Sequence, residues 1–205
     1  MHPERVGRRR MVGALLVLCG AAFAALLLAA PLRGADGLTC LGLPVTITEN
    51  DSGQPIGDDD DVVTRTDGDD VIKVLGGDDR VDALGQNDVV CGGDGNDDLR
   101  GGDGKDELRG RDGKDTLAGD DGEDLLFGRR GNDRLSGGAG SDEPGGGRGN
   151  DRSSGGAGKD YIYAAGGNDY VSGGAGKDFL WGGAARITSG ARKATTPSPA
   201  ATGAR

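Results

Sequence analysis

The stretch GGDGNDDLR (92–100) is followed at once by GGDGKDELR (101–109), and the two segments share one nine-residue pattern. The same frame runs without insertion or deletion from Ile56 to Trp181, which makes fourteen nonapeptides over 126 residues. The fourth position is Gly in twelve of them, and the eighth is Val, Ile or Leu in twelve. An unbroken repeat of this length indicates a solenoid. The sixth position is Asp in every repeat: Asp61, Asp70, Asp79, Asp88, Asp97, Asp106, Asp115, Asp124, Asp133, Asp142, Asp151, Asp160, Asp169 and Asp178.

One repeat can bury only its eighth-position side chain, so a second repeat must face it. The smallest closed coil is therefore two repeats, or eighteen residues. Successive coils then stack at the strand spacing of about 4.8 Å. This arrangement places Asp97 over Asp115 and Asp106 over Asp124, in two opposite columns.

The composition excludes an ordinary enzyme core. Of 205 residues, 43 are Gly and only 34% are hydrophobic, which is too little apolar side chain to offset the entropy of ordering the chain. The single His, His2, removes triad and His-ligated metal chemistry, and three Cys cannot form a four-thiolate zinc site. The HExxH and G-x-S-x-G motifs are also absent, so we expect no enzymatic activity.

The charge of the repeat region points to cations as partners. The chain has a formal net charge of −10, and residues 56–181 contain 15 Lys or Arg against 30 Asp or Glu. A block with this excess of negative charge repels phosphate backbones, which disfavours nucleic-acid binding.

The stacked carboxylates require a counterion. Two carboxylates about 4.8 Å apart repel by roughly 3 to 4 kcal/mol at an effective dielectric constant of about 20. Ca²⁺ suits the columns because it takes six to eight oxygen ligands from carboxylates and carbonyls, whereas Mg²⁺ prefers a tighter octahedron. If each ion bridges adjacent coils, the fourteen turns hold at most about twelve Ca²⁺ ions, and folding is coupled to binding.

The repeats match G-G-x-G-x-D-x-U-x, where U is a large apolar residue, so the chain resembles the RTX, or haemolysin-type, calcium-binding repeat family. The resemblance implies an all-β, right-handed parallel β-roll of about seven two-repeat coils, with six residues of each repeat forming the calcium-binding turn. Arg111, Asp120, Arg129, Ala164 and Ala165 depart from the first two positions of the motif. Besides the fourteen Asp residues, the expected metal-binding positions are Gly93, Gly95, Gly102, Gly104, Gly113, Gly122, Gly131, Gly140, Gly149 and Gly158.

The alternative interpretation of the fourteen sixth-position Asp residues is a solvated, disordered acidic chain. Disorder, however, does not require an aliphatic residue two positions after nearly every one of them. Other Asp residues occupy varying positions, and we expect them to form a solvated acidic face. They are Asp58, Asp59, Asp60, Asp67, Asp69, Asp78, Asp94, Asp103, Asp112 and Asp121.

The segments outside the repeats suggest export. Basic residues followed by an apolar run from Met11 to Leu32 predict an export signal over residues 1–35, with an uncleaved anchor as the alternative. Residues 36–55 are expected to form an N-terminal cap of one or two strands, and residues 182–205 a disordered tail. Outside the cell, Cys40 and Cys91 are expected to form a disulfide.

Two irregularities stand out in the repeat. Pro144 and Ser153 replace the aliphatic residue in consecutive repeats, which predicts a weak point or kink near residues 142–154. Near the end of the repeats, the eighteen-residue spacing places Tyr161 beside Phe179 and Tyr163 beside Trp181. This aromatic cluster suggests either a contact surface for a protein or carbohydrate, or a C-terminal cap covered by the tail.

These observations favour a secreted, extracellular calcium-binding protein that folds on binding calcium and has a structural, adhesion or surface role, with no membrane contact after signal removal. The alternatives are a non-catalytic calcium-binding subunit of a secreted protease or lipase, and a passive acidic calcium buffer. A buffer would bind calcium without a cooperative rise in β structure.

Overall fold

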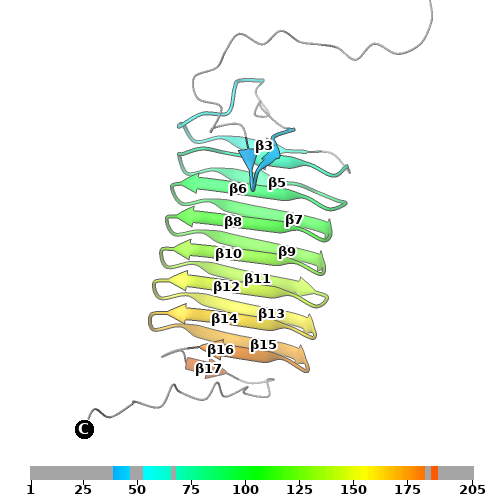
Figure 1. Cartoon of the computed structure of the whole chain (residues 1–205), viewed down its shortest axis with the longest axis vertical. Coiled ribbons are helices and arrows are strands. Elements are labelled where there is room, and N and C mark those ends of the chain that lie inside the picture. The colour runs from blue at the N-terminus through cyan, green and yellow to red at the C-terminus, as the bar shows by residue number, and fades with distance from the viewer. Residues whose placement is uncertain (1–38, 47–52, 66–67, 183–185, 189–205) are drawn as a thin grey trace, which may run out of the picture. The chain divides into compact units, whose positions relative to one another are not determined.

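The computed structural model describes residues 39–46, 53–65, 68–182 and 186–188 (Figure 1). The expected export signal at 1–35 and residues 189–205 of the expected tail lie outside the described residues. Among those described there is no helix of the length and apolarity needed to cross a membrane.

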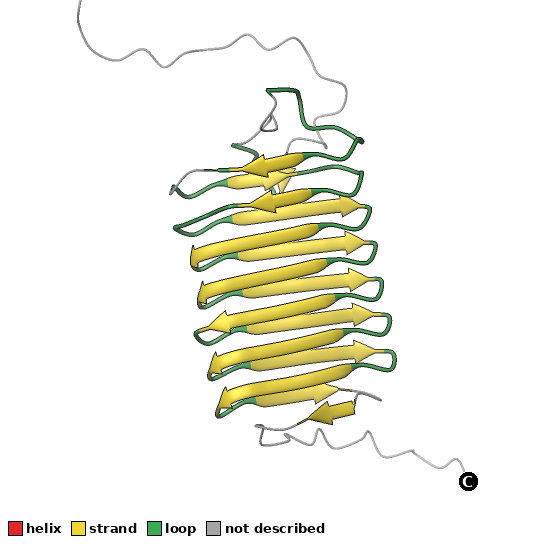
Figure 2. Cartoon of the chain, turned by 180° about the vertical axis from the view of Figure 1, so that it is seen from behind, coloured by secondary structure: helices red, strands yellow, loops and turns green. Residues whose placement is uncertain are grey.

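The repeats form a parallel β-solenoid of about seven turns, which confirms the predicted fold class. Successive repeats alternate between two facing sheets, so each sheet receives every second strand (Figures 1 and 2). One sheet has eight strands: β3 (Val62–Thr64), β5 (Arg80–Asp82), β7 (Asp98–Gly104), β9 (Thr116–Gly122), β11 (Arg134–Ala139), β13 (Arg152–Gly158), β15 (Tyr170–Gly176) and β17 (Arg186–Thr188). The other has seven: β4 (Val71–Lys73), β6 (Val89–Asp94), β8 (Glu107–Asp112), β10 (Leu125–Arg130), β12 (Glu143–Arg148), β14 (Tyr161–Gly166) and β16 (Phe179–Gly182).

The register confirms an eighteen-residue coil. Leu99 on β7 pairs with Leu117 on β9, which pairs with Leu135 on β11. Because side chains alternate across a strand, the eighth-position residue points inward while its two neighbours point outward. The burial pattern of β7 shows this alternation directly: Leu99 is buried between exposed Asp98 and Arg100.

The apolar interior is divided at the coil that carries Pro144 and Ser153. One cluster of buried aliphatic side chains ends at Leu135, and a second begins at Ile162. Pro144 is buried in the gap, and Ser153 is 3% exposed with a hydroxyl that has no hydrogen-bond partner. The strand order of both sheets continues through this coil, but the pairing of β12 with β14 begins only at Gly145 with Tyr163 and omits Pro144.

Both ends of the roll carry additional strands. β1 (Thr39–Cys40) and β2 (Leu43–Pro44) form an antiparallel pair of their own, and the disulfide Cys40–Cys91 attaches this hairpin to β6. At the other end, β17 pairs in parallel with β15. Within the expected tail, residues 182–205, the structure contains this short strand, because the open edge of β15 offers unpaired backbone groups to the following chain.

Candidate calcium-binding columns

The fourteen sixth-position Asp residues lie where the turns enter the strands, and the solenoid brings them into two columns. Every one of them is buried, with at most 9% of its surface exposed. One column precedes the strands of the eight-stranded sheet and contains Asp61, Asp79, Asp97, Asp115, Asp133, Asp151 and Asp169. The other precedes the strands of the seven-stranded sheet and contains Asp70, Asp88, Asp106, Asp124, Asp142, Asp160 and Asp178.

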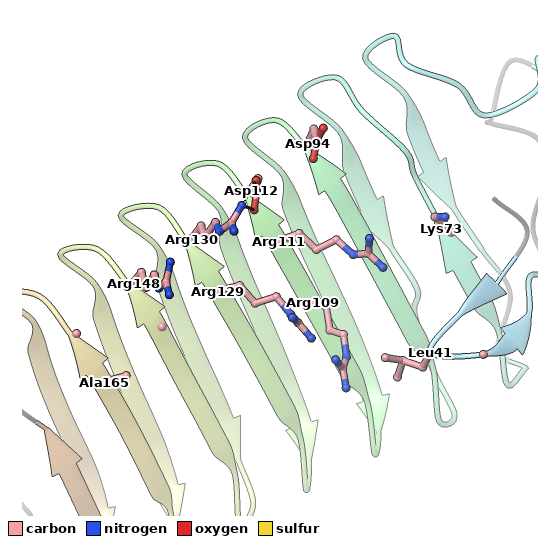
Figure 3. A pocket seen from close by; sticks show the side chains of 13 residues that line it. Leu41, Lys73, Asp94, Arg109, Arg111, Asp112, Arg129, Arg130, Arg148 and Ala165 are labelled. Atoms are coloured by element: carbon pink, nitrogen blue, oxygen red, sulfur yellow. Dashed lines mark hydrogen bonds and ion pairs between the residues drawn. The ribbon is translucent and has the colours of Figure 1, made fainter. Parts of the chain in front are cut away.

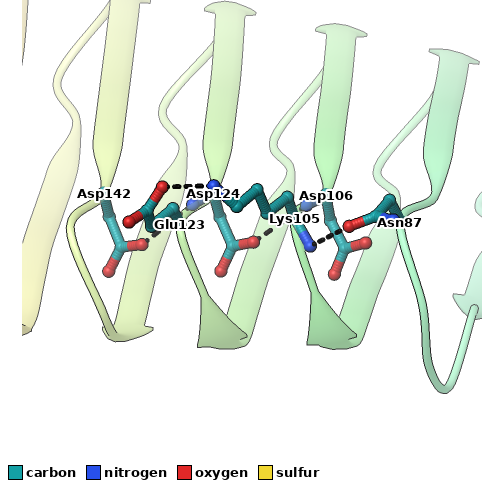
Figure 4. Close-up of polar contacts among 6 residues, drawn as sticks. All are labelled: Asn87, Lys105, Asp106, Glu123, Asp124 and Asp142. Atoms are coloured by element: carbon teal, nitrogen blue, oxygen red, sulfur yellow. Dashed lines mark hydrogen bonds and ion pairs between the residues drawn. The ribbon is translucent and has the colours of Figure 1, made fainter.

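In twelve of the fourteen Asp residues, one carboxylate oxygen is held by the neighbouring coil. The backbone N–H of Asp106 donates to Oδ1 of Asp124 at 2.9 Å, and the N–H of Asp124 donates to Oδ1 of Asp142 at 3.0 Å (Figure 4). Twelve such bonds, 2.8–3.3 Å long, run along the two columns. These charge-assisted bonds fix the orientation of each carboxylate and of its second oxygen.

That second oxygen, Oδ2, is buried and has no hydrogen-bond partner in thirteen of the fourteen Asp residues. A buried, unpaired carboxylate oxygen costs free energy, and native structures contain few of them. Within the described residues no three carboxylate, thiol or imidazole groups converge on a single point. A cation at these positions must therefore combine carboxylates with backbone carbonyl oxygens, which is the donor set that Ca²⁺ prefers.

The first-position glycines leave open the space that Oδ2 faces. A Cβ on Gly119 would lie 2.3 Å from Oδ2 of Asp124 and 2.6 Å from the carbonyl oxygen of Gly137 in the next coil. The same clash with Oδ2, at 2.0–2.5 Å, occurs in all nine repeats whose first residue is Gly. A carboxylate oxygen therefore borders a space that no side chain occupies, and in several repeats a carbonyl oxygen of the next coil borders it too.

The ten glycines expected to take part in metal binding have a different structural requirement. A Cβ on any of them would lie 1.4–1.9 Å from a carbonyl oxygen of the preceding coil, so they allow the turns to stack directly on one another. At Gly122, for example, the backbone φ is +159° and a Cβ would lie 1.4 Å from the carbonyl oxygen of Gly104. The second position tolerates side chains at a positive φ, as at Arg111 (102°) and Arg129 (83°).

Burial raises the pKa of many of the column carboxylates. Desolvation raises the pKa of Asp115 to about 7, and the neighbouring carboxylates of Asp133 and Asp97 raise it further, while the backbone N–H of Asp97 opposes the shift. Desolvation likewise raises the pKa to about 6 at six other members: Asp79, Asp88, Asp106, Asp124, Asp133 and Asp142. The ionised columns are therefore unfavourable without a compensating cation.

A second ladder, which sequence reasoning missed, runs along the exposed fifth position of the turns. The N–H of Lys105 donates to Oδ1 of Asn87 (Figure 4), and the N–H of Asn96 donates to Oδ1 of Asp78. Asp60, Asp69 and Asp78, which were expected only to form a solvated acidic face, accept such backbone bonds. The frequency of Asp and Asn at this position was the available sequence signal, because both residues readily accept local backbone hydrogen bonds.

The aromatic pairs occupy adjacent strands, as the spacing predicted. Tyr161 stacks on Phe179 with ring centroids 5.2 Å apart, and Tyr163 stacks on Trp181 at 4.7 Å. Tyr163 is 44% exposed, so one end of this stack is open to solvent.

Comparison with known proteins identifies the repeat. The sequence model described as "RTX calcium-binding nonapeptide repeat (4 copies)" matches residues 57–90, 64–99, 91–126, 109–144, 119–152 and 145–180. None of the curated proteins compared with the chain matches it.

Proposed function

Because the chain belongs to the RTX calcium-binding nonapeptide repeat family, we propose that it binds several Ca²⁺ ions along its two Asp columns and completes its folding by doing so. The observation that carries this proposal is the set of thirteen buried Oδ2 atoms without a hydrogen-bond partner. Binding a divalent cation there would neutralise the columns and remove the desolvation cost of those oxygens. Binding free energy then becomes folding free energy.

The best sites are proposed for the nine repeats that begin with Gly, because only there is the space beside Oδ2 free of a side chain. Their carboxylates are Asp97, Asp106, Asp115, Asp124, Asp133, Asp142, Asp151, Asp160 and Asp178. Carbonyl oxygens of the turns, such as that of Gly137, supply further ligands. Calcium fits this mixed set of oxygens better than magnesium, which keeps its water ligands.

The first repeats are proposed to depend less on calcium. Ile56, Arg65, Val74 and Ala83 occupy their first positions, and Val74 and Ala83 are fully buried in the apolar cluster. Apolar burial and the Cys40–Cys91 disulfide therefore support this end, whereas nine of the ten later repeats have Gly at the same position. We expect the roll to fold from its N-terminal end as calcium is added.

The biological role proposed is that of a secreted, structural or adhesive protein that folds outside the cell. A disulfide and a calcium-dependent fold both suit an oxidising, calcium-rich environment. The stack of Tyr161, Tyr163, Phe179 and Trp181, in which Tyr163 is exposed and the other three are half-buried, supports contact with a protein or carbohydrate partner.

Calcium titration of the purified chain, followed by circular dichroism, tests the proposal. A cooperative rise in β signal is expected, and a featureless titration would contradict it. Gly119→Ala should remove calcium from one site, because its methyl group would occupy the space beside Oδ2 of Asp124. Gly145→Ala is the matched control, since its nearest contact is an ordinary 3.6 Å to the Phe127 ring, and it should leave the number of bound ions unchanged.

A further inference from the structure

The outer face of the seven-stranded sheet carries a stack of side chains with one member missing. The ninth-position residues pair from strand to strand in the order Arg109, Phe127, Gly145, Tyr163 and Trp181. The Arg109 guanidinium lies over the Phe127 ring at 4.8 Å, and the Tyr163 and Trp181 rings stack at 4.7 Å. Gly145 contributes no side chain, so a slot opens between Phe127 and Tyr163.

This slot has the dimensions of a saturated ring. It encloses about 240 Å³ and is bordered by both aromatic residues and by Arg129 and Glu143. Two strand spacings place the Phe127 and Tyr163 positions roughly 9.6 Å apart. The centre of a ring inserted midway would lie about 4.8 Å from each of them. Nucleobases stack more closely, at about 3.4 Å. A thicker sugar ring fills the slot better and can place its C–H faces against both aromatic rings.

Beside the slot lies a groove of about 910 Å³ whose lining is rich in arginine (Figure 3). Two of its cations are neutralised locally, since Arg109 pairs with Glu107 and Arg130 pairs with Asp112. The guanidinium groups of the other three arginines on this face, Arg111, Arg129 and Arg148, form no ion pair or hydrogen bond within the described part of the chain.

These unpaired cations are crowded on a protein whose formal net charge is −10. Burial lowers the pKa of Arg129, and the nearby charges of Arg109 and Arg111 lower it further. An anionic ligand would relieve this repulsion, and guanidinium groups bind carboxylate or sulfate oxygens through paired hydrogen bonds.

We propose that this face binds an acidic polysaccharide, with one sugar ring in the slot over Gly145 and its anionic groups on Arg129, Arg111 and Arg148. Arg129 borders both the slot and the groove, so it joins the ring site to the charge site. Glu143, on the slot wall, accepts hydrogen bonds from sugar hydroxyls. The site uses side chains on the outer face, away from the buried Asp columns. It rests on the proposed function in requiring the calcium-loaded roll, and one wall of the slot, Tyr163, belongs to the aromatic stack proposed there as a contact surface.

The test measures binding of three probes to the calcium-loaded full chain. Hyaluronate oligosaccharides combine sugar rings with carboxylates, dextran has rings without charge, and polyphosphate has charge without rings. Calcium-induced folding of every variant is followed separately by circular dichroism. A loss of folding then counts against the proposed function, and a loss of probe binding with folding intact concerns this site alone.

The expected result is that hyaluronate binds more tightly than either other probe. Gly145→Phe, which fills the slot, and Arg129→Gln should each weaken hyaluronate binding by about tenfold, roughly the loss of one paired guanidinium contact. The controls, Ser136→Phe and Arg134→Gln, introduce the same residues on the exposed face of β11 and should leave hyaluronate binding unchanged. The proposal is overturned if Gly145→Phe has no effect on hyaluronate binding, or if dextran or polyphosphate binds at least as tightly as hyaluronate.

Discussion

Replacing one buried carboxylate should change the stability of the roll in opposite directions at low and high calcium. Asp124 is the best position, because its side chain is fully buried, its Oδ1 accepts the N–H of Asp106 at 2.9 Å, and its Oδ2 has no partner. Asp124→Asn preserves the shape and the Oδ1 acceptor while it removes the charge.

The size of the low-calcium effect follows from the electrostatics of the column. Burial raises the pKa of Asp124 from 3.8 to about 6, with a further contribution from Asp106. A shift of this size corresponds to about 3 kcal/mol against the ionised form at neutral pH. We therefore expect Asp124→Asn to stabilise the calcium-free fold at neutral pH by up to about 3 kcal/mol.

The high-calcium effect has the opposite sign. Each ion bound only by the folded state adds about 1.4 kcal/mol of stability for every tenfold rise in free calcium above its Kd. The variant loses at least one such ion, so its free energy of unfolding should rise less steeply with calcium. The two stability curves should cross, with the variant more stable at low calcium and the original protein more stable at high calcium.

Urea unfolding followed by circular dichroism, over free calcium from submicromolar to millimolar, measures both curves at neutral pH. Asp121→Asn is the control, because the substitution removes the same charge from the protein and Asp121 lies on an exposed part of β9. The control curve should parallel that of the original protein. The reasoning is refuted if the Asp124→Asn curve also runs parallel to it, or if the variant is the less stable protein without calcium.

Four further outcomes are expected. Because burial raises the pKa of Asp115 to about 7, the calcium-free fold binds more protons than the unfolded chain between about pH 4 and 7. The stability of the calcium-free fold should therefore fall as the pH rises through this range, and its β signal should grow on acidification. A β signal that does not depend on pH would contradict this. Calcium affinity should rise with pH, since protons compete with calcium for the same oxygens. Calorimetric titration at two pH values measures this, and equal affinities at the two values would contradict it. Ser153→Ala should raise the urea midpoint, with a gain of about 1 kcal/mol, because the buried hydroxyl has no partner; a lower midpoint would indicate that the hydroxyl is bonded. Reducing the Cys40–Cys91 disulfide should lower the free energy of unfolding by about 4 kcal/mol on the loop-entropy model. Urea unfolding with and without reductant measures this, and equal midpoints would show that the disulfide contributes little.

The strict nine-residue period was sufficient to predict the architecture. Asp at every sixth position and an aliphatic residue at nearly every eighth require a coil of two repeats, and they imply both the columns and the apolar interior. The same reasoning identified the interruption at Pro144 and Ser153 and the stacking of Tyr163 on Trp181. These features depend only on which residues lie eighteen positions apart, and a regular solenoid converts that separation directly into contact.

Other features require the coordinates because they depend on the direction in which each turn residue points. The motif includes both Gly119 and Gly122, but the structure shows that one keeps the space beside Asp124 open and the other allows two coils to touch. The arginine groove and the slot over Gly145 combine the second, third, seventh and ninth positions of repeats that lie several coils apart. A period specifies which residues are neighbours along the column. The backbone path through the turn decides which of these residues share a face. The side chains of the six turn residues can point in several directions, whereas those of the three strand residues can only alternate between the two faces of the sheet.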